Sequence, residues 1–402
     1  MRLPRGIYPL LYPFLAVLYL RGFLQRYGQL KRLLAEEKWR VLCIFPSYQT
    51  GGAEKVHTAI LNAIRDLDPL TIIAHKSKDE TFKAGMRAHS AGFVDFHKYG
   101  DNTIYAWFIR RMIVRRVNQS SRPVTLFSSN TGLFYQVLPQ IGRPGVKKVD
   151  LLHAFSPYGN GIEDKSIPCV PLLDLRIVIN RKTIADFRAQ YQAHHLAESY
   201  LQRIKEIGNA APEGIRPRVR MPGASYKCLF VARGSAEKRP WIYGRVATAC
   251  AKRGLPVSFS SIGDNEGLVS PEDRPHIRFY GSMSDEEKVL AVFDEHDFLI
   301  TCSEYEGFPM TIMEGLSGGI INISVDVGGI AEHLNNVNSV LLPAEGKSEA
   351  QLVADFCTAI QELVDHPREI PTLSEAAIRY ASGRFSYQHF KQQYIHALTP
   401  DL

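Results

Sequence analysis

Apolar and polar positions alternate along most of the chain in a way that predicts short buried strands, each followed by a helix. Residues 40–46 (RVLCIFP) form an almost continuous apolar run, which is typical of a strand buried on both faces of a sheet. After a loop with two glycines, the apolar positions of residues 54–67 recur at helical spacing. Because strands and helices keep alternating, we expect an α/β fold built on parallel sheets.

The alternation is interrupted at residues 209–225, which contain three prolines and two glycines and lack apolar periodicity. Such a composition is typical of a linker between domains. We therefore expect two Rossmann-like domains, at residues 38–220 and 226–383, with a cleft where the carboxyl ends of their strands face each other. The predicted strands lie at residues 40–46, 70–75, 124–129, 147–155 and 175–180, and then at 227–232, 256–263, 276–281, 297–303 and 320–325.

The N-terminal segment, residues 1–37, differs from both domains in charge. The first forty residues carry eight basic and two acidic side chains and thus most of the net charge of +7. As a helix, the apolar run at residues 7–20 would be about 21 Å long, shorter than the ~30 Å hydrocarbon core of a bilayer. Arg21 follows where a secretory cleavage site needs small residues. We expect neither a membrane-spanning helix nor a cleaved signal peptide.

Two prolines limit the helix that this segment can form, because Pro9 and Pro13 should interrupt or kink it before about Phe14. Beyond them, basic side chains lie between apolar ones at helical spacing, which predicts a basic amphipathic helix. We expect residues 1–34 to lie on an anionic membrane surface; packing on the protein's own domain or against another subunit is the alternative. The apolar positions are Phe23, Leu24, Tyr27, Leu30, Leu33 and Leu34.

A second basic patch lies in residues 107–117 (WFIRRMIVRRV), which place four arginines on a short apolar helix. Nucleic acid would attract such charge, but the sequence contains no recognisable nucleic-acid-binding module. We therefore do not expect nucleic acid as a partner.

Composition narrows the class of protein further. With 45% hydrophobic and 22% charged residues among 402, the chain is typical of a soluble globular protein with two sizeable cores. The six cysteines are far apart and form no C-x-x-C pair, which favours buried free thiols in a reducing compartment. The thirteen histidines show no zinc-binding spacing, so we expect neither a metal site nor an obligatory cofactor.

The stretch SEYEGFPMTIMEGLSGG, residues 303–319, contains the most informative spacing. Glu306 lies in a loop at the carboxyl end of a predicted strand, and Pro309 suits the first position of a helix. The free backbone N–H groups there suit a phosphate or sugar hydroxyls. Glu314 lies about one and a half turns into the helix and projects back toward its start, where it can accept two ribose hydroxyls.

Together with DVGGIAE at residues 326–332, this stretch resembles the signature of the large retaining glycosyltransferase family 4. That family has the GT-B fold of two Rossmann-like domains, and the resemblance extends over residues 40–390. It implies that residues 384–402 form a C-terminal helix that crosses back to the first domain. Further segments that resemble family motifs are SYQTGGAEKV (47–56), LFVARGSAEKRP (229–240), SIGDNEG (261–267) and RFYGSMSDEE (278–287).

The resemblance implies roles for four charged residues. Arg233 and Lys238 resemble the pair that holds the donor diphosphate, and such charges can stabilise a leaving group without a metal. Glu314 resembles the residue that binds the ribose. Glu306 resembles the residue beside the transferred sugar, where a carboxylate can bond a hydroxyl or balance an oxocarbenium ion.

The resemblance also implies uncharged contributors to the site. Gly51 and Gly52 resemble a glycine loop that lets the backbone approach the donor, although an ordinary turn is the alternative. His153 resembles a histidine that borders the sugar site, although a structural role is the alternative. The backbone at Gly307 and Phe308 completes the expected donor site.

Three positions depart from the family pattern and bear on how the donor fits. Ala232 precedes Arg233 where the family commonly has glycine, and Arg239 follows Lys238 where glycine is also common. Asn180 stands where serine is frequent.

We predict a retaining glycosyltransferase that takes sugar from a UDP- or GDP-sugar, with His153 and Glu306 at the reacting sugar. The basic N-terminus favours a lipid-linked or lipopolysaccharide-type acceptor, and a location in the cytoplasm, peripheral on the inner face of the cell membrane. A sugar-nucleotide epimerase or phosphorylase of the same fold is one alternative. A catalytically silent, membrane-docked binding subunit is another.

Overall fold

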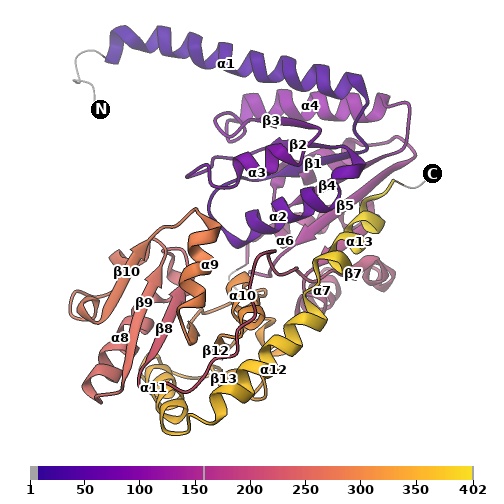
Figure 1. The fold of residues 1–402 in the computed structure, drawn as a ribbon. Helices are drawn as coiled ribbons and strands as arrows, with labels where there is room; N and C mark the ends of the chain where they lie inside the picture. The colour runs from indigo at the N-terminus through magenta and orange to yellow at the C-terminus, as the bar shows by residue number, and fades with distance from the viewer. Residues whose placement is uncertain (1–7, 157–158, 401–402) are drawn as a thin grey trace.

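The computed structural model of the protein describes residues 8–156 and 159–400. Two parallel sheets follow one another along the chain, each wrapped by helices, which confirms the predicted fold of two Rossmann-like domains (Figure 1). Both sheets place their first strand near the middle, so the chain winds outward in both directions from it.

The first sheet has the strand order β3-β2-β1-β4-β5-β6-β7 within the described residues, and all its strands are parallel. Its central strands are buried along their whole length, as their apolar runs predict. In chain order its strands are β1 (Val41–Phe45), β2 (Pro69–Ile73), β3 (Gly92–Asp95), β4 (Val124–Ser129), β5 (Val146–Leu152), β6 (Leu175–Val178) and β7 (Ile204–Glu206).

Helices cover both faces of this sheet, and each face has its own buried apolar cluster. One cluster includes side chains of α2, whereas the other includes side chains of α1 and α4. The α-helices of this half are α1 (Tyr8–Glu36), α2 (Gly52–Ala63), α3 (Lys83–Ala88), α4 (Thr103–Gln119), α5 (Gly132–Val137), α6 (Ile162–Ser166) and α7 (Arg181–Ala193).

The second sheet repeats the pattern with the order β10-β9-β8-β11-β12-β13. Its strands are β8 (Tyr226–Val231), β9 (Val257–Ile262), β10 (Ile277–Gly281), β11 (Phe298–Thr301), β12 (Ile321–Asp326) and β13 (Val340–Pro343). The helices of this half are α8 (Pro240–Lys252), α9 (Glu286–Asp294), α10 (Met310–Gly318), α11 (Glu349–Asp365), α12 (Glu369–Arg384) and α13 (Tyr387–Leu398).

The two halves share one of their apolar clusters. Residues of α10, α12 and α13 are buried in the same cluster as β1 and α2, so the core continues from one domain to the other. α13 packs against α2, and the Phe385 carbonyl accepts a hydrogen bond from the Ala211 amide at 3.1 Å. The segment that joins the sheets is itself anchored, because the buried Arg220 donates to the His296 carbonyl at 2.8 Å.

The N-terminal helix corrects two expectations. α1 runs without interruption from Tyr8 through Pro9 and Pro13, so of the expected interruption or kink before Phe14 the interruption does not occur. Phe23, Leu30 and Leu34 are buried against α4 and β3, so the apolar face predicted to meet a membrane is in part the face that packs on the domain. Of the helices that the structure describes, none has the combined length and apolarity to cross a bilayer.

Candidate active site

Two helices begin opposite each other where the domains meet. α2 has Gly51 as its N-cap and α10 has Pro309, and neither cap makes a side-chain hydrogen bond to its helix. A Cβ on Gly52 would lie 3.6 Å from the Cγ of Met310, so the two helix starts are adjacent across the cleft. Their backbone N–H groups and the positive ends of both helix dipoles make this space suitable for an anion.

Glu306 lies in the loop before α10 and is held within its own domain. Its Oε1 accepts hydrogen bonds from the Lys238 ammonium at 2.5 Å and from the Ser303 hydroxyl at 2.7 Å. The Glu306 side chain is 11% exposed and that of Lys238 20%, so the pair is shielded but remains open to a ligand. The structure therefore brings together two of the residues that the sequence assigned to the donor site.

Close backbone contacts fix this loop and explain its glycines. A Cβ on Gly307 would lie 2.0 Å from the carbonyl oxygen of His153, so the two domains touch at a position where no side chain fits. Gly328 has φ near +60°, and a Cβ there would lie 1.7 Å from the Glu306 carbonyl oxygen. The Gly329 amide donates to the Gly307 carbonyl at 3.0 Å. The loop that carries Glu306 is thus packed from both sides.

Glu314 is buried on α10 and is held from the opposite domain. Its Oε1 accepts from the ammonium of Lys55, on α2, at 2.7 Å. The same ammonium is 2.7 Å from Glu286 at the start of α9. Burial raises the pKa of Glu314, and the charge of Lys55 acts against that rise.

The phosphate-binding pair predicted after β8 is divided between two partners. Lys238 contacts Glu306, whereas the Arg233 guanidinium donates to Glu237 at 2.9 Å and remains 56% exposed. Both stand on the short connection between β8 and α8. An exposed guanidinium with one surface partner is free to turn toward an anion, because such a pair holds it only weakly.

Arg239 explains one departure from the family pattern. Its backbone has φ 50 and ψ 52, a left-handed conformation in which glycine is the usual residue. Its guanidinium donates to the carbonyls of Cys302 at 2.6 Å and Ser303 at 2.7 Å. These bonds tie the start of α8 to the loop that carries Glu306, which offsets the backbone strain.

His153 stands after β5 and is paired with a second histidine, His57 of α2. Their Nε2 atoms are 3.2 Å apart, and the His57 ring stacks on Phe45 at 4.4 Å between centroids. Burial lowers the pKa of His153 to about 4, and burial followed by its neighbour lowers the pKa of His57. Both rings are therefore neutral near pH 7, and His153 can act on a sugar as a hydrogen-bonding group but not as a cation.

The side chain of Phe308 is buried against His333, with ring centroids 4.0 Å apart, and near Phe385. Only its backbone can face a donor. Asn180 caps α7 by accepting from the Thr183 amide at 2.8 Å, which shows why an amide serves where serine is frequent.

A cavity of about 240 Å³ opens beside Glu306 and is lined from both domains. Its walls include Asp186 on α7 and the buried Asn180, whose Nδ2 has no hydrogen-bond partner in the parts of the chain described. A space of this size with carboxylate and amide groups suits a hydroxyl-rich ligand. The other lining residues are Phe155, Ser156, Lys182, Thr183, Tyr305, Gly328 and Gly329.

The sequence interpretation missed three residues at this site, and two of them, Lys55 and Glu332, join the domains. Lys55 follows the glycine loop, and its position beside that loop was a usable signal. His57 lies one helical half-turn further on and carried no signal of its own. Glu332 accepts hydrogen bonds from the Arg181 and Lys182 amides at 2.9 and 2.6 Å, a pairing between distant segments that no local pattern reveals.

Comparison with known proteins identifies the family of the second domain. The model of the family described as "Glycosyl transferases group 1" matches residues 225–366, which carry Arg233, Lys238, Glu306 and Glu314. The chain carries a group 1 glycosyltransferase domain. The glycosyltransferase is 23% identical over 352 residues to the O-antigen biosynthesis glycosyltransferase WbnH of Escherichia coli, an alignment that covers 86% of this chain and 95% of that protein.

Solved structures agree with the two-domain fold of this glycosyltransferase. Anabaena Alr3699/HepE in complex with UDP-glucose matches with a TM-score of 0.68 at 17% identity, covering 89% of this chain and 98% of that one. The lipopolysaccharide outer core galactosyltransferase WaaB matches with a TM-score of 0.64 at 17% identity, covering 89% and 99%. These similarities confirm the GT-B arrangement of the two Rossmann-like domains.

Proposed function

We propose that this glycosyltransferase is retaining and transfers a sugar from a UDP- or GDP-sugar to a hydroxyl of a lipid-linked or lipopolysaccharide-type glycan at the inner face of the cell membrane. The names of its relatives support the acceptor class, because WbnH is an O-antigen biosynthesis enzyme and WaaB a lipopolysaccharide outer core enzyme. The complex of HepE with UDP-glucose supports a nucleotide-sugar donor.

The observation that carries the proposal is the pairing of two uncapped helix starts, at α2 and α10, beside Lys238. A nucleoside diphosphate that leaves a sugar gains negative charge, and N–H groups and an ammonium fixed in place stabilise that charge. Arg233 stands five residues before Lys238 and can turn toward the same diphosphate. Glu314 then lies where it can accept the ribose hydroxyls, and Glu306 beside the sugar.

Retention follows, in this proposal, from attack on the face that the diphosphate leaves. The acceptor hydroxyl forms the new C–O bond while the old sugar–phosphate bond breaks, and the hydroxyl proton passes to an oxygen of the leaving diphosphate on the same face. Asp186 lines the cavity with Glu306, but the ammonium of Lys182 is hydrogen-bonded to it on the same helix. We therefore assign Asp186 to binding hydroxyls and do not assign it as a nucleophile.

Calorimetric titration of UDP and GDP tests the donor site. We expect one of the two to bind the wild-type protein, and Lys238→Ala and Glu314→Ala each to weaken that binding at least tenfold, with Lys252→Ala on the distant end of α8 as the control. Equal affinity in all four proteins would show that these residues do not hold the nucleotide.

Donor turnover separates the alternatives. With candidate UDP- and GDP-sugars, the proposal predicts glycosyl transfer to membrane lipid extracts or slow donor hydrolysis, and no epimerised donor. Epimerised donor without transfer indicates an epimerase, sugar phosphate formed with inorganic phosphate indicates a phosphorylase, and unchanged cellular glycan in Lys238→Ala indicates a silent binding subunit. Each of these three results would contradict the proposal.

The membrane part of the proposal rests on α1 and α4, which lie side by side (Figure 1). Ring contacts join Tyr19 to Tyr105 and Tyr27 to Phe108, so the helices run in the same direction. Together they carry most of the large apolar side chains that are exposed in the described chain. These are Val17, Leu18, Tyr19, Leu20 and Leu24 on α1, and Ile104, Trp107 and Phe108 on α4.

The charge of this surface complements an anionic bilayer. Residues 16–35 and 103–119 contain eight basic side chains and no acidic one, and none of the eight forms an ion pair with any part of the chain that the structure describes. Each basic side chain near an anionic surface contributes about 1 kcal/mol to binding. The two patches that looked separate in the sequence thus form one surface, which we call the α1–α4 surface.

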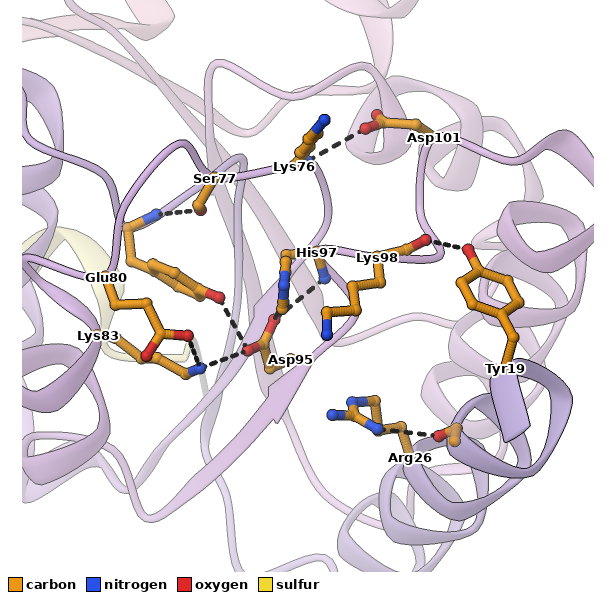
Figure 2. Close-up of polar contacts among 12 residues, drawn as sticks. Tyr19, Arg26, Lys76, Ser77, Glu80, Lys83, Asp95, His97, Lys98 and Asp101 are labelled. Carbon is orange, nitrogen blue, oxygen red and sulfur yellow. Dashed lines mark hydrogen bonds and ion pairs between the residues drawn. The ribbon is translucent and has the colours of Figure 1, made fainter. Parts of the chain in front are cut away.

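A short loop connects the α1–α4 surface to the cleft side of the first sheet. Figure 2 shows the loop after β3 between Tyr19, whose hydroxyl donates to the Lys98 carbonyl, and the polar residues around Asp95. Asp95 Oδ2 accepts from the hydroxyl of Tyr48, which belongs to the loop with Gly51 and Gly52, at 3.1 Å. In this proposal, the α1–α4 surface holds the first domain at the membrane, and these contacts connect that surface to the loop with Gly51 and Gly52.

Vesicle sedimentation tests the α1–α4 surface. Because Phe23 and Leu30 are core residues, the surface is best altered by exposed substitutions and not by deletion of the helix. We expect Arg111→Glu with Arg115→Glu to weaken binding to phosphatidylglycerol vesicles by about 30-fold or more, since two favourable contacts become unfavourable. Leu20→Ser with Leu24→Ser should weaken binding at least tenfold.

The controls are Lys252→Glu with Arg253→Glu for charge and Val337→Ser for an exposed apolar side chain, all in the second domain. Donor hydrolysis should persist in every variant, because none alters the cleft. Sedimentation of the α1–α4 variants at the level of wild type would refute the membrane role.

A further inference from the structure

Glu314 stands in an unfavourable place for a residue that must act as an anion. Its side chain is 6% exposed, on a helix packed against β11, β12, α9 and α12. A carboxylate out of water resists ionisation unless a cation or hydrogen-bond donors compensate it. A ribose diol needs the ionised form, because only that form accepts two hydroxyl hydrogens and offers none of its own.

The groups that face Glu314 are few. Lys55 of α2 contacts its Oε1 at 2.7 Å, and Glu286 of α9 contacts the same ammonium at 2.7 Å. The other oxygen of Glu314 has no hydrogen-bond donor among the residues described. Burial opposes a charge on Lys55, but Glu314 and Glu286 together raise the pKa of Lys55, so it is a cation at neutral pH. Its positive charge is the one that acts on Glu314.

We propose that Lys55 is a positioning residue that keeps Glu314 ionised and turned toward the nucleotide ribose. This inference rests on the ribose role of Glu314 in the proposed function. Lys55 occupies Oε1 and leaves Oε2 for a ribose hydroxyl, and a second hydroxyl can share Oε1 with the ammonium. Lys55 itself need not touch the nucleotide.

Lys55 belongs to the first domain and Glu314 to the second, so their ion pair depends on how close the two domains lie. The ion pair with Glu314 exists only while α2 and α10 are close, so the ribose-binding carboxylate is complete only when the domains are closed. By reciprocity, a nucleotide that binds the ionised Glu314 also stabilises the closed arrangement. Donor binding and domain closure are thereby linked through one side chain.

The test compares UDP with 2′-deoxy-UDP, or GDP with 2′-deoxy-GDP if the protein prefers guanine, by calorimetric titration between pH 6 and pH 9. In the wild-type protein, we expect a constant preference for the ribonucleotide over this range. In Lys55→Met, Glu314 loses its cation and protonates more readily. Ribonucleotide affinity should therefore fall about tenfold at pH 7, the preference should disappear, and both should recover toward pH 9.

Lys55→Arg should restore the flat pH profile, and Lys288→Met, on the exposed side of α9, is the control. Glu286→Gln should change affinity less than threefold, because the Glu286 charge opposes ionisation of Glu314 and its loss leaves Lys55 in place. Melting temperatures of all variants show whether each one folds. A Lys55→Met profile that is unchanged, or lowered equally at every pH, would overturn the proposal.

Glu314→Ala separates this inference from the function on which it rests. If Glu314→Ala loses the preference for ribose at every pH while Lys55→Met keeps a flat profile, the ribose role stands and the role of Lys55 is wrong. If Glu314→Ala keeps the preference, the ribose role itself is wrong, and the proposal for Lys55 falls with it.

Discussion

The two glutamates of residues 303–319, Glu306 and Glu314, each pair with a lysine, but the two lysines belong to different domains. Glu306 pairs with Lys238 of its own domain, through a loop that glycines and Arg239 fix in place. Glu314 pairs with Lys55 of the other domain. In the proposed function, the carboxylate beside the sugar is thus held by its own domain, whereas the carboxylate that binds the ribose needs both domains. We expect changes at Lys238 to lower kcat as well as nucleotide binding, and changes at Glu314 to act mainly on binding.

The largest expected effect is on the preformed pair. Lys238→Ala should lower kcat by about 10²–10³-fold, because a fixed cation beside a leaving group is worth more in the transition state than in the ground state. Glu314→Ala should instead raise the Kd of the nucleotide with a much smaller change in kcat. Steady-state kinetics with a single donor measure both. If the two variants lowered kcat equally, Lys238 and Glu314 would not differ in their roles in the chemical step and in binding.

A smaller effect is expected where the domains touch. Gly307→Ala places a methyl group against the His153 carbonyl, so the domains must separate slightly or the backbone must shift. Such overpacking costs about 1–3 kcal/mol, which corresponds to a 5- to 150-fold loss in kcat/KM. The control is Gly267→Ala, whose added methyl group meets no atom within 4 Å. Activity of Gly307→Ala equal to that of the control would show that this contact does not matter for closure.

The stability of the shared core should depend on pH through His333, which packs between Phe308 and Tyr380. Burial lowers the pKa of His333 from 6.5 to about 4, so the unfolded chain binds a proton before the folded one does. Its contribution to stability is therefore complete above pH 6.5 and is lost as the pH falls toward 4. Between pH 7.5 and pH 5 the loss is about 2 kcal/mol from this residue.

Denaturant unfolding at several pH values measures this loss. His333→Gln should have a lower free energy of unfolding than wild type at pH 7.5. The difference between the two proteins should be smaller at pH 5, by about 2 kcal/mol. A difference in free energy of unfolding that is constant with pH would mean that His333 has the same charge in the folded and the unfolded protein.

The smallest effect is expected at Asp186, on the first domain's wall of the cavity beside Glu306. If it binds hydroxyls only, Asp186→Asn should lower kcat less than about tenfold, because an amide can still accept a hydrogen bond. A loss of several orders of magnitude, with a trapped covalent intermediate, would instead make Asp186 a nucleophile and would replace front-face attack by double displacement.

Most of the fold could be predicted because central strands such as β1 (Val41–Phe45) are fully buried apolar runs. The strands that the pattern missed are β3, β7 and β13, which lie at sheet edges or near them and are short. β7, with the sequence IKE, has too few apolar positions to show a period, since an edge strand needs burial on fewer sides.

The candidate site could be outlined from the sequence only where its residues fall in local motifs. Glu306, Glu314 and Lys238 could be selected from their spacing and family resemblance. Their partners across the cleft could not, because the pairing of Lys55 with Glu314 depends on how two domains dock over a separation of 259 residues. The N-terminal helix was difficult to interpret for a different reason. Its single amphipathic pattern includes apolar residues that pack on the domain, such as Phe23 and Leu30, and others that remain exposed.

A crystal structure of the protein with UDP or GDP, whichever binds more tightly, tests the central claim most directly. We expect the ribose hydroxyls within hydrogen-bond distance of Glu314, the diphosphate between the starts of α2 and α10 beside Lys238, and Lys55 still paired with Glu314. A nucleotide bound elsewhere, or one whose ribose faces away from Glu314, would contradict the assignment of Glu314 and Lys55 to the ribose and of Lys238 to the diphosphate.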